Sequence, residues 1–164
     1  MTLTAKLIID HLGRMKQLHE SLLVLSRKKT EALKTNDMDA LQLCLSQERK
    51  HVSAINSLEK KRSAAVKEWA AGKQGFADAV PKVSDIIKWS RWPDREQLEE
   101  VYNSFILVLA DLKQQEVLNG ELTKQSLQFI NMSLDLLQPS LNNLNYGHAS
   151  GSNGQNRSVF DSQA

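Results

Sequence analysis

The longest amphipathic pattern in the chain runs from Asp94 to Gln138. Its apolar residues recur at the spacing of one helix face: Leu98, Val101, Tyr102, Phe105, Leu109, Leu112, Leu122, Phe129, Ile130, Leu134 and Leu137. Asp94 and Gln97 have the spacing of a capping box, and Pro139 lacks the N–H that would continue a helix. The pattern therefore predicts a helix over residues 94–138. Such a helix would be about 67 Å long, which predicts an elongated molecule.

One stretch of this pattern is poor in apolar residues. Residues 114–121 read QQEVLNGE, and Gly120 costs about 1 kcal/mol relative to alanine inside a helix. Two interpretations stay open. Gly120 either marks a hinge or lets a neighbouring helix approach closely.

Two further amphipathic patterns precede this helix. The first spans residues 4–34, with apolar positions Leu7, Ile8, Met15, Leu18, Leu22, Leu25, Ala32 and Leu33. The second spans residues 38–71, with Met38, Leu41, Leu45, Val52, Ile55, Leu58, Ala65, Val66 and Trp69. Between them, Asn36 can take the left-handed conformation that ends a helix, and Asp37 can cap the next one. So short a link predicts an antiparallel helical hairpin.

Three residues of the second pattern need a separate interpretation. Glu48 and Arg62 interrupt its apolar stripe, either as solvated gaps or as halves of polar pairs that fix the register between helices. We favour solvated gaps. Cys44, the single cysteine, excludes an internal disulfide and is predicted to be a small packing residue.

Residues 76–93 are predicted to form an ordered connector with a short helical piece around Val83, Ile86, Ile87 and Trp89. Trp89 and Trp92 either form a recognition patch or plug the open end of the bundle, and we favour the plug. Residues 139–164 are rich in Ser, Asn and Gly and are predicted to be a flexible tail. The predicted fold is all-α: an antiparallel bundle or coiled coil, made of a hairpin plus a long C-terminal helix, over residues 1–138.

The charge of the chain is unevenly distributed. The net charge is +2, but residues 1–75 hold 14 Lys/Arg against 8 Asp/Glu, and residues 76–164 hold 7 against 11. A basic half could bind nucleic acid or an anionic membrane, but packing of oppositely charged helices explains the same numbers, and we favour packing. No apolar run is long enough for a membrane span or a signal peptide, so we expect a cytoplasmic protein without membrane insertion.

Catalytic and metal-binding templates find no match in the sequence. The nearest is Glu48 with His51, an E-x-x-H spacing found in di-iron helical bundles, but the second copy that such a site needs is missing. Phosphate-binding loops, dinucleotide fingerprints and paired-cysteine motifs are also missing. We therefore expect no enzymatic activity, no metal and no cofactor.

Two blocks of sequence resemble the FlgN family of flagellar export chaperones. The block EALKTNDMDALQLCLSQERKHVSAINSLEKKR is similar to the N-terminal hairpin of that family. The more specific block is LNGEL at residues 118–122 followed by KQSLQFINMSLDLLQP, which resembles the family's C-terminal helix, and Asn145-Tyr146-Gly147 resembles the Tyr-Gly that follows it.

The resemblance implies a cytosolic chaperone of the flagellar type III export system. Its clients would be the hook-filament junction proteins, whose terminal helical segments it would keep soluble and deliver to the export gate. The candidate client-binding residues, which share one side of the helix, are Leu122, Phe129, Ile130, Leu134 and Leu137. By the same resemblance, Tyr146 is the candidate for docking on the export gate.

Two other classes of function stay open. The long helix could make the chain a self-associating structural coiled-coil protein without a client, and a homodimer would form through it. The basic hairpin could serve a nucleic-acid accessory protein, although the runs at residues 27–29 and 60–62 lack the interleaved aromatic residues of single-strand binders. We therefore expect no nucleic acid among the partners.

Overall fold

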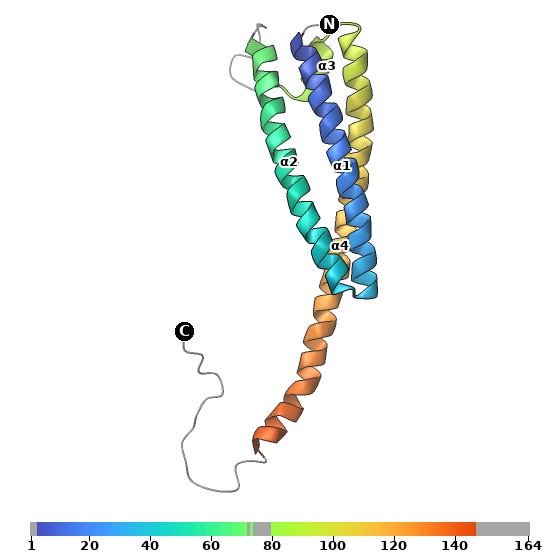
Figure 1. The fold of residues 1–164 in the computed structure, drawn as a ribbon, viewed down its shortest axis with the longest axis vertical. Coiled ribbons are helices and arrows are strands. Elements are labelled where there is room, and N and C mark those ends of the chain that lie inside the picture. The colour runs from blue at the N-terminus through green and yellow to red at the C-terminus, as the bar shows by residue number, and fades with distance from the viewer. Residues whose placement is uncertain (1–2, 72, 74–79, 147–164) are drawn as a thin grey trace, which may run out of the picture. The chain divides into compact units, whose positions relative to one another are not determined.

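The computed structural model describes residues 3–71, 73 and 80–146, and the side chains of residues 4–71, 73 and 80–137. Its four helices are α1 (Leu3–Thr35), α2 (Met38–Ala71), α3 (Val83–Trp89) and α4 (Asp94–Tyr146) (Figure 1). No strand occurs in these residues, so the all-α prediction is confirmed. The chain divides into two compact units, residues 1–123 and residues 124–164, which are described separately below.

The link between α1 and α2 has the predicted turn chemistry. Asn36 has a positive φ of 55°, the left-handed conformation that asparagine adopts more readily than most residues. The backbone N–H of Ala40 donates to Asp37 Oδ1 at 3.0 Å, so Asp37 caps α2. These local contacts turn the chain back on itself, and the predicted hairpin forms.

Cross-helix contacts give the direction of each helix in the first unit. Ser21 and Lys29 of α1 meet His51 and Glu48 of α2, so α1 and α2 are antiparallel. Farther along the chain, His19 contacts Phe105, and Thr30 contacts Asn119, so α1 and the first part of α4 run in the same direction. Figure 1 shows these helices side by side, with α3 near the N-terminal end of α1.

The hydrophobic core of the first unit lies among all four helices. Its buried members are Ile8, Leu12 and Met15 of α1, Leu58, Ala65, Val66, Trp69 and Ala70 of α2, Ile86 and Ile87 of α3, and Leu98 and Phe105 of α4. Cys44 is also buried, as predicted. Burial of this set supplies the main stabilising term of the unit, at about 25 cal/mol per Å² of apolar surface removed from water.

The tryptophans of the connector do not plug the bundle. Trp89 is 52% exposed and Trp92 is 80% exposed, whereas Trp69, Ile86 and Ile87 are buried. The plug interpretation is therefore wrong, because the isoleucines of the short α3 occupy the inward positions and leave the following aromatic residues outside. Residues 76–79 of the predicted connector lie outside the described residues.

Helix α4 begins at Asp94 as predicted, but its N-terminal cap and its C-terminal end differ from the prediction. The N–H of Gln97 donates to the carbonyl oxygen of Pro93, so Asp94 lies in the first turn instead of at the cap. At the other end the helix continues through Pro139 to Tyr146, eight residues beyond the predicted end. A proline removes one backbone hydrogen bond and crowds the preceding turn, but the hydrogen bonds on either side can continue the helix. Residues 147–164 of the predicted tail are outside the described part of the chain.

The backbone stays helical at Gly120. A Cβ atom built on Gly120 would meet nothing within 4 Å, so no described neighbouring helix packs closely against Gly120. The close-approach interpretation is therefore wrong, and the hinge interpretation stays a prediction.

Candidate functional site

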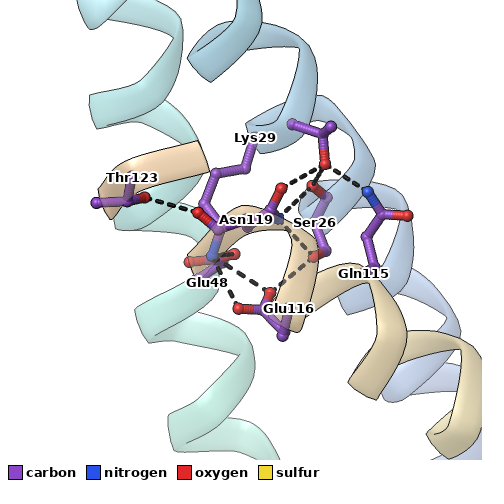
Figure 2. Close-up of polar contacts among 8 residues, drawn as sticks. Ser26, Lys29, Glu48, Gln115, Glu116, Asn119 and Thr123 are labelled. Atoms are coloured by element: carbon purple, nitrogen blue, oxygen red, sulfur yellow. Dashed lines mark hydrogen bonds and ion pairs between the residues drawn. The ribbon is translucent and has the colours of Figure 1, made fainter. Parts of the chain in front are cut away.

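A buried polar layer replaces the apolar stripe where the sequence is poor in apolar residues. Asn119, only 2% exposed, donates from Nδ2 to the carbonyl oxygen of Ser26 at 2.9 Å and to Ser26 Oγ at 3.0 Å (Figure 2). Thr30 Oγ1 contacts Asn119 Oδ1 and accepts a hydrogen bond from Gln115 Nε2. Buried amides and hydroxyls that satisfy one another fix the register of α4 on α1, because a shift would leave them without partners.

A charged group lies beside this layer. Lys29 Nζ forms ion pairs with Glu48 of α2 at 2.8 Å and with Glu116 of α4 at 3.2 Å, and Ser26 Oγ donates to Glu116 at 2.7 Å. Burial alone would lower the pKa of Lys29, but its hydrogen bonds to the two glutamates and their charges outweigh burial and raise that pKa above the ordinary value. One ammonium group therefore joins three helices.

The structure shows the partners of Glu48 and Arg62, the two residues that interrupt the apolar stripe of α2. Glu48 is half of a pair between helices, so the solvated-gap interpretation is wrong for this residue. Arg62 instead pairs with Glu59 in its own helix, at 2.8 Å from Nε. The Lys29–Glu116 pair also joins the basic half of the chain to the acidic half. Among the described residues, pairs within single helices include Lys16–Glu20, Glu31–Lys34, Glu59–Arg62 and Arg95–Glu99.

The five candidate client-binding residues divide between the two units. Leu122 lies in the first unit and is partly buried. Phe129, Ile130, Leu134 and Leu137 lie in the second unit, and each is more than half exposed, with Phe129 at 65%. These four side chains give this helix segment an exposed apolar surface, which is a common property of protein-binding sites.

The exposed apolar surface of this helix segment is wider than the sequence pattern predicted. Leu127, Met132 and Leu136 are also exposed. At about 100° per residue, the exposed apolar side chains of residues 127–137 span roughly 220° of the helix circumference. The polar residues Lys124, Gln128, Asn131 and Asp135 occupy a single stripe on the opposite side. The i, i+4, i+7, i+11 spacing of this polar stripe was the signal that could have revealed the full width.

The remaining sequence candidates have these positions. Tyr146 is the last residue of α4, and its side chain is not among those described. Glu48 and His51 of the E-x-x-H spacing have protein partners, since Glu48 pairs with Lys29 and His51 hydrogen-bonds with Ser21 and Gln47. In the described residues no group of three or more His, Cys, Asp or Glu side chains is arranged to hold a metal ion.

A helical protein with this much apolar surface on one helix belongs to the class that binds other proteins. The profile of the family described as FlgN protein matches residues 1–154, and the chain therefore belongs to the FlgN family of flagellar type III export chaperones. It is also 38% identical, over 144 residues, to the Bacillus subtilis (strain 168) protein described as "Uncharacterized protein YvyG". That alignment covers 88% of this chain and 87% of the relative. No solved structure matches the chain significantly.

Across the described helices, none combines the length and the hydrophobicity that crossing a membrane requires.

Proposed function

We propose that this chaperone binds the terminal helical segments of hook-filament junction proteins through α4 residues 122–137. In this proposal it works in the cytoplasm without enzymatic activity, keeps these clients soluble and delivers them to the flagellar export gate. The observation that carries the proposal is the exposed apolar surface of residues 127–137, because a chaperone of helical segments needs apolar surface that stays accessible until the client arrives.

The width of this surface supports a particular mode of binding. An amphipathic helix that packs on one neighbour needs an apolar stripe about 100° wide, and this segment offers roughly twice that. One client helix would cover only part of it. We therefore expect a client to contact α4 on two sides, either with two helices or with a helical hairpin, and to leave the stripe of Lys124, Gln128, Asn131 and Asp135 in water.

Calorimetric titration of the full chain with a purified hook-filament junction protein tests this proposal. Phe129→Ala should weaken binding by about 2 kcal/mol or more, because large aromatic residues at the centre of an interface contribute most of its affinity. Leu127→Ala tests the other side of the surface, about 160° around the helix from Phe129, and should also weaken binding. Gln128→Ala is the matched control on the polar stripe and should leave the affinity unchanged.

The outcomes separate this proposal from the structural alternative. If Phe129→Ala folds normally and binds the client with unchanged affinity, residues 122–137 are not the client surface. The same apolar surface could instead pair with a second copy of the chain. Sedimentation equilibrium would then show a stable oligomer without client that Phe129→Ala dissociates, and the structural coiled-coil function would replace the chaperone mechanism.

A further inference from the structure

The first unit carries a small tryptophan-lined pocket, away from residues 122–137 in the sequence. The pocket has a volume of about 300 Å³, and its lining includes Trp69, Lys73, Trp89, Arg91, Trp92 and Asp94. This volume is at the lower limit for ligand pockets, which run from about 300 to 1,000 Å³. It suits a single anchoring side chain better than a cofactor.

The aromatic side chains of this pocket differ in burial. Trp69 is buried and forms the inner part of the lining, whereas Trp89 is half-exposed and Trp92 is 80% exposed. Lys73 Nζ lies 4.0 Å from the centre of the Trp69 ring, a cation–π contact that holds a positive charge at the pocket. Tryptophan is among the residues most enriched in binding hot spots. Trp92 lies two residues before Asp94, the first residue of α4.

The charges around the pocket favour an acidic partner. Lys73 and Arg91 line it, and the exposed Lys88 directly precedes Trp89. Asp94 is the acidic side chain in the lining, and it lies in the first turn of α4, where the backbone N–H groups stabilise a carboxylate. Asp85 accepts a hydrogen bond from the backbone N–H of Lys82 at the start of α3. The accessible charge beside the exposed tryptophans is therefore positive.

We propose that this pocket docks an acidic segment of a partner protein that carries one large apolar side chain. The apolar side chain packs against Trp89 and Trp92, and flanking carboxylates pair with Arg91 and Lys73. This pocket shares no residue with the proposed client surface on residues 122–137.

The test uses the full chain and fluorescein-labelled pentapeptides with blocked ends. The acidic probe has a central phenylalanine between pairs of acidic residues, and fluorescence anisotropy measures its binding. We expect saturable binding that weakens as salt rises. A basic probe with the same phenylalanine, and an acidic probe with glycine in its place, should each bind at least tenfold more weakly.

Three variants assign the binding to this pocket. Trp92→Ala and Arg91→Glu should each weaken binding of the acidic phenylalanine probe at least tenfold, while circular dichroism remains unchanged. Lys60→Glu, an exposed α2 residue, is the matched control because it changes the net charge equally, and it should retain most of the affinity. Equal binding of the basic probe, no binding at millimolar concentration, or equal loss in Lys60→Glu would overturn the proposal. Trp92→Ala should bind the hook-filament junction protein with unchanged affinity. Failure of the pocket proposal would therefore not contradict the proposed client surface on residues 122–137.

Discussion

The side-chain amide of Asn119 on α4 donates to both the backbone carbonyl oxygen and the hydroxyl of Ser26 on α1. The two residues are 93 positions apart in the sequence. Asn119 belongs to the LNGEL block at residues 118–122, which carries the more specific part of the family resemblance. That block therefore has a structural role, because it attaches α4 to the hairpin.

Replacement of Asn119 should destabilise the first unit. Asn119→Ala removes the donors to Ser26 and leaves buried polar groups of Ser26 and Thr30 with fewer partners, which should cost about 2–4 kcal/mol. Urea unfolding measures this loss. Asn103→Ala, at an exposed position of the same helix, is the control and should stay within about 0.5 kcal/mol of the wild type. A similarly small effect for Asn119→Ala would show that the polar layer does not stabilise the bundle.

Gly120→Ala should stabilise the protein. The backbone is helical at Gly120 and a Cβ there meets nothing within 4 Å, so alanine should gain about 0.5–1 kcal/mol. Gly13→Ala is the matched comparison, since Gly13 is also helical with open space around its Cβ position. If Gly120 is a hinge that client handling requires, Gly120→Ala should lower export while Gly13→Ala does not. Equal export by both variants would remove the hinge interpretation.

The Lys29 ion pairs should make stability depend on pH in the alkaline range. Because the pKa of Lys29 is raised in the folded state, its stabilising contribution is fully present below the unfolded pKa, about 10.4, and is lost as the pH rises through the folded pKa. The free energy of unfolding of the wild type should exceed that of Lys29→Met by a constant amount from pH 7 to about pH 10. The difference should shrink above that range. A difference that stays constant to pH 12 would contradict this assignment.

Phe129 and Phe105 should respond differently to truncation. Phe105 is a core residue, 8% exposed and in edge contact with the His19 ring, so Phe105→Ala should cost about 3–5 kcal/mol. Phe129 is 65% exposed, so Phe129→Ala should cost the free protein less than about 1 kcal/mol. Thermal unfolding without client compares the two variants. A large loss for Phe129→Ala would mean that the residue belongs to a core and does not wait for a client.

Tyr146→Ala should separate client binding from delivery. Tyr146 ends α4, nine residues beyond Leu137 of the proposed client surface, so its truncation should leave client affinity unchanged. If Tyr146 docks on the export gate, secretion of hook-filament junction proteins should fall in cells that carry the variant. Calorimetry and a secretion assay measure the two effects. Normal secretion would exclude Tyr146 from gate docking, and Tyr146→Phe distinguishes a need for the hydroxyl from a need for the ring.

The sequence by itself determined the features that depend on local chemistry. Helical periodicity predicted α2 with the bounds that the structure shows and α1 to within one residue at each end. The turn at Asn36 and Asp37 was predictable because left-handed backbone and side-chain capping involve only neighbouring residues. The exposed face of residues 127–137 was partly predictable, since a helical wheel places Phe129, Ile130, Leu134 and Leu137 together without knowledge of any partner.

Only the tertiary structure decided the features that depend on what lies across from a residue. Residues 114–121 are poor in apolar side chains because Ser26 and Thr30 of α1 supply polar partners there, which the sequence pattern did not reveal. The sequence pattern also did not reveal that Glu48 forms an ion pair with Lys29. Nor did it reveal that Ile86 and Ile87 occupy the core positions, so that Trp89 and Trp92 stay exposed. The physical reason is that the free energy of a buried polar or aromatic side chain is set by its partners, and a one-dimensional pattern does not contain them.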